Sequence, residues 1–310
     1  MPAASLRALL AQSIDYAGMF PPCSLALEPA LRNQAEYVRD PDAWMLGAFV
    51  LSIEQFDAAK RLLSQFDPLH PLRVAALGPK TANADAFLEA LENAEAAIRS
   101  LSRHNVDLVS ISHLEMFLPG DNRSPSRTDV TLLKEARSIL GNLPVFREAP
   151  AVRAEQIIAL LAEQNANADL ATFGFKLRTG GVTVDAFPTS TQIARVLVTP
   201  TTQQVPIKFT AGLHHPLRQY REEVQTRMYG FLNVLGAAVL AAEHRWDAQQ
   251  TSVMLEDEKA DSFSFTDDFF AWREWKLDIK RLQYRRRFVV SFGSCSFDEP
   301  REDLRALNLL

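Results

Sequence analysis

Two lysines lie where a buried strand would be expected, each near the end of a short apolar run. The first is Lys176 in Phe175-Lys176-Leu177, and the second is Lys208 in Ile207-Lys208-Phe209. Removing an ammonium group from water is costly unless a charged partner or a reaction compensates for it. Small residues follow both lysines, as in a turn that leaves room for a ligand. The two lysines therefore predict an active site.

The elements that would position these lysines alternate between strand-length apolar runs and stretches of helical periodicity, which is typical of parallel α/β architecture. Eight runs are expected to be strands: Ile14–Phe20, Trp44–Ser52, Leu72–Gly78, Val106–Phe117, Leu143–Ala149, Ala171–Arg178, Pro206–Ala211 and Phe288–Phe292. Eight such units predict an α/β fold of the (β/α)8 TIM-barrel type, in a single domain over residues 1–310. The structural alternative is an open, doubly wound sheet. The first run also suits a loop, because it contains Gly18 and leads into Pro21-Pro22.

Polar side chains gather at the ends of four successive expected strands, where barrels of this type carry their active sites. The catalytic candidates are Lys176, Lys208, Glu148, Glu115 and His113. His113 and Glu115 share a face, because side chains alternate along a strand with period two. Each residue alone is equally well explained by an ion pair or a capping contact, but their shared position favours a site. Asp15 and Tyr16 end the first run and face the barrel mouth or cap the Gly18 turn.

Two turns of small residues follow the seventh and eighth strands, where such barrels commonly bind phosphate through backbone N–H groups. They predict a small anionic substrate, although any tight turn needs small residues. Together with Arg178, whose planar guanidinium suits a carboxylate or phosphate, they give the expected substrate- and anion-binding residues: Arg178, Thr179, Gly180, Thr210, Gly212, His214, Gly293 and Ser294. Cys295 in the second turn is either a thiol activated near a helix N-terminus or a buried small residue.

The patterns Lys176-x-x-Thr179-Gly180 and Lys208-x-Thr210-x-Gly212 resemble the paired lysine motifs of deoxyribose-phosphate aldolase, a class I aldolase with a barrel fold. The resemblance implies that Lys176 forms a Schiff base with a carbonyl substrate and that Lys208 lowers its pKa, since a neighbouring cation disfavours protonation. It implies a lyase. The sequence departs from that family in having His113 and Glu115 in place of an aspartate on the fourth strand, and Arg178 in place of a small residue.

The whole chain also resembles an uncharacterised bacterial barrel family, through Ile14-Asp15-Tyr16-Ala17-Gly18-Met19-Phe20-Pro21-Pro22 and Thr210-Ala211-Gly212-Leu213-His214-His215-Pro216. This resemblance implies no activity.

Two other functions stay open. Glu115, Glu148 and a histidine would give the oxygen and nitrogen ligands of a divalent metal, in a metal-assisted lyase or isomerase. Adjacent histidines point in different directions, so at most one of His214 and His215 is expected to be a ligand. No other cofactor is predicted. The third function is a non-catalytic binding or assembly module.

That module would use a long connection between the seventh and eighth strands, residues 213–287, which is predicted to be a helical insertion. Its expected helices are Met228 to Ala242 and Asp267 to Arg286. Aromatic residues such as Phe263, Trp272 and Trp275 are unlike a free linker and predict a lid, a homo-oligomer interface or an extra helical layer.

Composition and charge disfavour several classes of binding partner. A net charge of -5 and a pI near 5.8 provide no basic field for nucleic acid or anionic lipid. Two cysteines far apart in sequence, Cys23 and Cys295, argue against a disulfide-stapled secreted scaffold and favour a cytoplasmic location. Residues 1–13 lack the features of a signal peptide. The chain has no phosphate-binding Gly-Lys-Ser/Thr loop, no Gly-x-Gly-x-x-Gly and no Gly-x-Ser-x-Gly, which disfavours nucleotide-dependent kinases and serine hydrolases.

Overall fold

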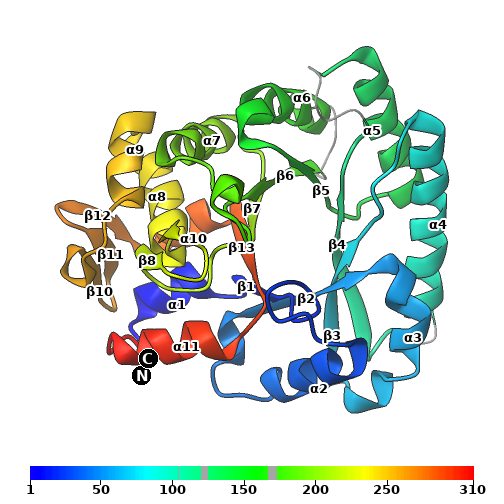
Figure 1. Ribbon diagram of the computed structural model, residues 1–310, viewed down its shortest axis with the longest axis horizontal. Helices are drawn as coiled ribbons and strands as arrows, with labels where there is room; N and C mark the ends of the chain where they lie inside the picture. The colour runs from blue at the N-terminus through cyan, green and yellow to red at the C-terminus, as the bar shows by residue number, and fades with distance from the viewer. Residues whose placement is uncertain (104, 120–124, 167–172) are drawn as a thin grey trace.

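A computed structural model describes residues 1–103, 105–119, 125–166 and 173–310 of the chain. Eight parallel strands close into a barrel in the order β1-β13-β7-β6-β5-β4-β3-β2, with helices around it (Figure 1). The predicted (β/α)8 fold is therefore confirmed, and the open doubly wound sheet is wrong. Strands β1 and β13, from opposite ends of the chain, lie side by side and complete the ring.

The barrel strands fall within or close to the eight predicted runs. They are β1 (Ile14–Tyr16), β2 (Leu46–Ser52), β3 (Leu72–Leu77), β4 (Val109–Met116), β5 (Val145–Ala149), β6 (Phe173–Arg178), β7 (Ile207–Thr210) and β13 (Val289–Ser294). The first is the shortest, because the chain turns away at Gly18. Residues 171–172, where the sixth strand was expected to begin, lie outside the described residues.

Helices cover the outside of the barrel. They are α2 (Leu27–Tyr37), α3 (Phe56–Lys60), α4 (Ala84–Ser102), α5 (Arg127–Leu140), α6 (Ala154–Ala166), α7 (Ser190–Gln203) and α11 (Asp298–Ala306), with α1 (Ala4–Leu10) before the first strand. Side chains cap the first turns of several helices. Asn83 accepts a hydrogen bond from Ala86 N at the start of α4, and Ser126 with Asp129 forms a capping box at the start of α5. No helix in the described part of the chain is long and apolar enough to cross a membrane.

The insertion between β7 and β13 contains both helices and strands, which corrects the prediction that it is helical. Besides α8 (Phe231–His244), α9 (Ala248–Leu255) and α10 (Ile279–Arg286), it contains the hairpin β8 (Gln219–Arg221) and β9 (Thr226–Met228) and a three-stranded sheet, β10 (Phe263–Phe265), β11 (Phe269–Trp272) and β12 (Trp275–Asp278). Aromatic residues favour strands, and Phe270, Trp272 and Leu277 are buried at alternate positions of this sheet. The helix expected from Asp267 therefore begins only at Ile279.

The insertion forms an extra layer on the side of the barrel, and it does not cover the mouth as a lid. Helix α8 packs on the barrel wall, where the Phe231 and Phe292 rings stack with centroids 5.1 Å apart. The three-stranded sheet contacts α1, and Ser5 N donates to Thr266 O over 3.1 Å. Figure 1 shows this sheet beside α1 and α8, outside the ring of strands. The aromatic residues of the insertion therefore stabilise its attachment to the barrel.

Candidate active site

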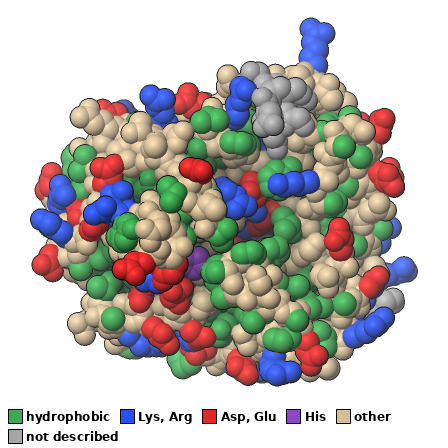
Figure 2. Space-filling model, in the orientation of Figure 1, with side chains coloured by type: hydrophobic (Ala, Val, Ile, Leu, Met, Phe, Trp, Pro, Cys, Tyr) green, Lys and Arg blue, Asp and Glu red, His purple; other side chains and the backbone are tan. Residues whose placement is uncertain are grey.

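A cavity of about 420 Å³ opens at the carboxyl ends of the barrel strands. Its floor and walls carry charged side chains from β4, β5, β6 and β7, and apolar side chains such as Phe20, Pro21 and Phe117 also line it. Figure 2 shows acidic and basic atoms together in a hollow of the surface, surrounded by hydrophobic side chains. The cavity lies where active sites of this fold occur.

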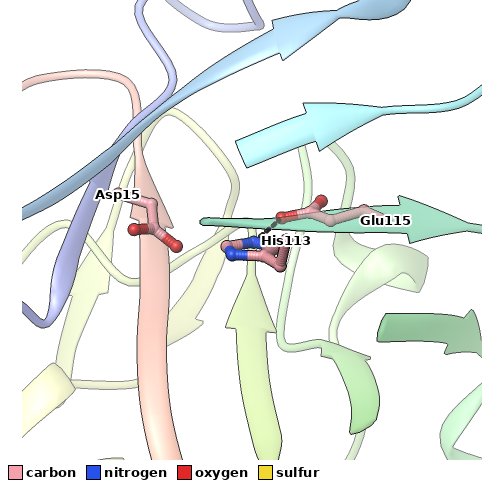
Figure 3. A group of neighbouring side chains, drawn as sticks. All are labelled: Asp15, His113 and Glu115. Carbon is pink, nitrogen blue, oxygen red and sulfur yellow. Dashed lines mark hydrogen bonds and ion pairs between the residues drawn. The ribbon is translucent and has the colours of Figure 1, made fainter. Parts of the chain in front are cut away.

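Lys208 lies at the bottom of this cavity and is 1% exposed. Its Nζ is 2.8 Å from Asp15 Oδ2, 2.7 Å from His113 Nε2 and in hydrogen-bond contact with Glu115 Oε1. The three partners come from β1 and β4, and Figure 3 shows their side chains converging inside the barrel. Each N–H donor of the Lys208 ammonium group thus has an acceptor, which offsets the cost of burying its charge.

The hydrogen bonds around His113 define its tautomer. Ser112 Oγ lies 3.0 Å from Val74 O, to which it donates its proton, and 2.8 Å from His113 Nδ1. A hydroxyl has one proton, so Ser112 must accept from His113 Nδ1–H. His113 Nε2 then accepts from Lys208, and Glu115 Oε1, which lies 3.1 Å from Nε2, is a second acceptor of the same ammonium group. Burial is the main reason that the pKa of His113 is lowered, followed by the charge of Lys208, so the imidazole is neutral.

Asp15 is fixed from three sides. Its Oδ1 accepts from Ala48 N over 2.7 Å, and its Oδ2 accepts from Ser291 Oγ over 2.5 Å as well as from Lys208. A side chain at Gly47 would lie 2.3 Å from Asp15 Oδ1, so this approach requires glycine. Asp15 therefore ties β1 to β2, β7 and β13 in the middle of the barrel.

Lys176 is the other buried ammonium group, 5% exposed and closer to open space. Its Nζ lies 2.6 Å from Glu115 Oε2 and 2.7 Å from Glu148 Oε2. Strand register explains the arrangement, since Lys176 pairs with Glu148 on β5 and with Lys208 on β7. Glu115 therefore bridges the two lysines with its two oxygens.

The charged groups of this network keep one another ionised. Burial alone would raise the pKa of Glu115, but Lys176 and Lys208 outweigh it and hold that pKa well below the ordinary value of 4.5. The same balance, with Lys208 as the largest opposing influence, lowers the pKa of Asp15. Burial would lower the pKa of Lys208, but Asp15 and Glu115 raise it above 10.5. Both carboxylates and the Lys208 ammonium are thus ionised at neutral pH.

Arg178 and Lys80 provide positive charge nearer to solvent. Arg178 Nη2 donates to Glu148 Oε1 over 3.3 Å, while about half of its side chain is exposed. Lys80 Nζ lies 4.5 Å from the centre of the Phe117 ring, and both residues line the cavity. A small anion entering the cavity would meet these two cations before it reaches Lys176.

The predicted anion-binding residues separate into two groups. Thr210, Gly212, His214 and Gly293 line the cavity, as do Arg178 and the lysines. Three others lie outside its lining: Thr179, Gly180 and Ser294. Thr179 Oγ1 donates to Ala211 O over 2.6 Å, and Ser294 Oγ donates to Ser296 O over 2.7 Å. Gly180 packs directly against Gly212. These residues shape the loops.

The histidine pair after β7 does not join the buried carboxylates, contrary to the ligand set expected for a metal. His215 Nδ1 lies 2.6 Å from Asp303 Oδ2 on α11, and His214 Nδ1 lies 3.4 Å from Glu299 Oε2. The group that does converge is Asp15, His113 and Glu115, whose donor atoms lie within 4.8 Å of one another. Lys208 Nζ contacts all three, so an ammonium group already occupies the position that an ion would take among these ligands.

The two cysteines meet at the rim of the cavity. Cys295 is buried and lines it, while Cys23 is exposed. Burial raises the pKa of Cys295 to about 12, so its position near α11 does not activate the thiol. Between the two interpretations of Cys295, the structure favours the buried small residue.

Comparisons with known proteins identify no family for this chain. No family model and no curated protein matches the chain. A solved structure of xylanase XynB from Paenibacillus barcinonensis, complexed with a conduramine derivative, is 12% identical, with a TM-score of 0.44 over 94% of this chain and 86% of that chain. A GH10 xylanase from termite gut that contains a bacterial Ig-like domain is also 12% identical, with a TM-score of 0.40 over 99% and 79%. Such distant likeness carries no argument about activity.

Fold and site together define a (β/α)8 barrel with a buried lysine and carboxylate network at its mouth.

Proposed function

We propose that the protein is an enzyme that binds a small anionic carbonyl compound and forms a Schiff base with it through Lys176, in a lyase reaction that breaks or makes a carbon–carbon bond. The observation that carries this proposal is the position of Lys176 Nζ, in the cavity wall between Glu115 Oε2 at 2.6 Å and Glu148 Oε2 at 2.7 Å. An amine needs a nearby base to become a nucleophile, and here two carboxylates are in hydrogen-bond reach.

The two carboxylates have different surroundings, which suggests different roles. Glu115 also holds Lys208 and is held ionised by both lysines. Glu148 faces the cavity and Arg178, so it is the better candidate for taking the proton of Lys176. The neutral amine then attacks the carbonyl carbon, and Glu148 returns the proton as the carbinolamine loses water. The protonated imine formed in this way withdraws electrons from the neighbouring carbon–carbon bond.

Lys208 supports this chemistry from below. Its Nζ lies behind Glu115, on the strand next to Lys176, and 5.8 Å from the centre of the Phe146 ring. By binding Glu115 Oε1, Lys208 holds that carboxylate in place beside Lys176. Lys208 itself is enclosed by Asp15, His113 and Glu115, so Lys176 is the lysine that a substrate can reach.

The substrate class follows from the cavity. Arg178 and Lys80 lie at its outer part, and Arg178 offers a planar fork for a carboxylate or phosphate. A volume of about 420 Å³ suits a small metabolite. We therefore assign the anionic group of the substrate to the rim and its carbonyl group to Lys176.

Intact-protein mass spectrometry after borohydride reduction tests the proposal, with a panel of small phosphorylated and carboxylated aldehydes and ketones. Lys176→Arg keeps a charge between Glu115 and Glu148, so it is the variant of choice. Lys134→Ala removes an exposed lysine of α5 that does not line the cavity, and it serves as the control. We expect a reduced adduct on the parent and on Lys134→Ala, but none on Lys176→Arg. An adduct that persists on Lys176→Arg, or none with any compound, would contradict the proposal.

A metal-assisted lyase or isomerase is the second candidate, favoured by the convergence of Asp15, His113 and Glu115. An ion could replace the Lys208 ammonium only if that side chain withdrew. On the Schiff-base proposal, a chelator leaves the yield of reduced adduct unchanged. A yield that falls with EDTA and returns with Zn²⁺ or Mn²⁺ would favour the metal instead.

A further inference from the structure

Cys23 and Cys295 are 272 positions apart in the chain, yet their Sγ atoms lie 3.0 Å from each other. Both are free thiols. The sulfur atoms are about 1 Å beyond the length of a disulfide bond. Only a small movement of the side chains therefore separates the two thiols from a covalent link.

The backbone holds the two cysteines in place from both sides. Tyr16 on β1 is the register partner of Ser294 on β13, and Ala17 N donates to Ser294 O over 2.7 Å. The loop that carries Cys23 is closed on itself, since Leu25 N donates to Gly18 O over 2.9 Å and Ser24 N donates to Phe20 O over 3.0 Å. The approach of the two sulfur atoms is thus built into the closure of the barrel.

We propose that Cys23 and Cys295 form a reversible intramolecular disulfide, which makes this pair an oxidation site at the rim of the cavity. The proposal does not depend on the reaction of Lys176. Pro21 and Pro22, which follow β1, and Gly293 and Cys295, at the end of β13, all line the cavity. The bond would join these two segments of its wall covalently.

The exposure of the two thiols sets the order of the reaction. Cys23 is exposed and meets the oxidant first, whereas Cys295 is buried. With a hydroperoxide, the Cys23 thiolate attacks the peroxide oxygen, the O–O bond breaks, and Cys23 becomes a sulfenic acid. Cys295 then loses its proton, its sulfur attacks the Cys23 sulfur, and water leaves as the S–O bond breaks. The two thiols give up two electrons, and hydrogen peroxide accepts them as it becomes two molecules of water.

A base for the second step lies close to Cys295. His214 Nδ1 is 3.9 Å from Cys295 Sγ and 3.4 Å from Glu299 Oε2. The ring nitrogen at this distance can receive the thiol proton, and the Glu299 carboxylate beside it stabilises the positive charge that forms. Such help matters because a buried thiol is a poor nucleophile while it keeps its proton.

The test uses the full-length protein treated with hydrogen peroxide, unfolded, and alkylated with N-ethylmaleimide before intact-mass and peptide analysis. We expect the oxidised parent to be lighter by two hydrogen atoms, to resist alkylation at both cysteines, and to recover both thiols after dithiothreitol. Peptide mapping should show Cys23 linked to Cys295 within one chain. Cys23→Ser changes an exposed residue, so it should fold normally and leave Cys295 alkylatable after oxidation.

Three results would overturn the proposal. The first is alkylation of both cysteines after peroxide treatment. The second is a Cys23 sulfinic acid beside an unchanged Cys295 thiol, which would mean that the second thiol cannot reach the first. The third is a disulfide between two chains, seen as a dimer on a non-reducing gel.

Discussion

Lys176 and Lys208 are register partners on neighbouring strands, and both ammonium groups contact the carboxylate of Glu115, one at each oxygen. Two cations brought this close would repel each other without that bridge. Glu115 thus fixes the spacing between a lysine that faces the cavity and a lysine that is enclosed.

Lys208→Met should destabilise the protein strongly, because it leaves Asp15 and Glu115 buried with one cation fewer. Breaking a buried pair from one side costs about 3–5 kcal/mol. Urea unfolding followed by circular dichroism measures the free energy of unfolding. Lys134→Met, on an exposed face of α5, is the control and should stay within about 0.5 kcal/mol of the parent. A Lys208→Met protein as stable as this control would show that the network does not stabilise the fold.

The cost of Lys208→Met should shrink as the pH falls from 7 to 5. In the parent, the lowered pKa values of Asp15 and Glu115 give stability that is present above their ordinary values of 3.8 and 4.5 and is lost as the pH falls through the folded values. Without Lys208, burial is the largest influence on Asp15 and raises its pKa. The variant then binds a proton on acidification and gains stability. A difference between the two proteins that stays constant over this range would contradict the assignment.

His113 should be neutral at pH 6.5, where an ordinary histidine is half protonated, with its proton on Nδ1. Its pKa is lowered from 6.5, so the unfolded chain takes up a proton that the folded chain refuses, and stability due to this group falls as the pH drops below 6.5. Nitrogen-15 NMR of the imidazole ring measures both tautomer and titration. Ser112→Ala removes the acceptor of Nδ1–H and should broaden or shift this resonance. An ordinary titration of His113 near pH 6.5 would refute the enclosed network.

Gly212→Ala should cost about 1–3 kcal/mol and displace the loops at the cavity. Gly212 has a φ of 79°, and a Cβ atom there would lie 2.9 Å from Gly180 Cα. Gly293→Ala is the matched control in the other loop, because a Cβ atom there meets only Thr210 Oγ1, at 3.7 Å. Thermal unfolding of the two variants compares the effects. Equal stability of the two variants would mean that the close approach of Gly180 and Gly212 is not required.

The sequence could predict the barrel and the lysines, since both depend on local patterns. Strand-length apolar runs give the eight strands, and a lysine inside such a run is conspicuous because burial of its charge is costly. Of the three partners of Lys208, Asp15 is harder to identify than His113 and Glu115, and so is the Ser291 hydroxyl that donates to Asp15. Asp15 stood out only as the end of an uncertain strand, and Ser291 has no local signal at all. Their roles depend on ring closure, which brings β1 beside β13.

Local sequence patterns did not predict the hydrogen bonds of two hydroxyl groups or the strands of the insertion. Thr179 follows β6 and Ser294 ends β13, where an anion site is expected, but their side chains bond to nearby backbone carbonyls, which depends on the conformation of the chain after each strand. The charged stretch from Asp267 suggested a helix, whereas the pairing of β11 with β10 and β12 imposes strands. Tertiary pairing outweighs local propensity there.

The closure of the barrel by β1 and β13 also has a consequence for folding during synthesis. Asp15 leaves the ribosome early, but Ser291, which donates to it, is made 276 residues later. Until then β1 has only one neighbour in the ring, and the carboxylate of Asp15 lacks part of its final surroundings. Contacts of such long sequence separation form late and slowly. The nascent chain must therefore keep the Lys208 ammonium and its carboxylates hydrated, and the dry interior of the site is formed in one of the last steps of folding.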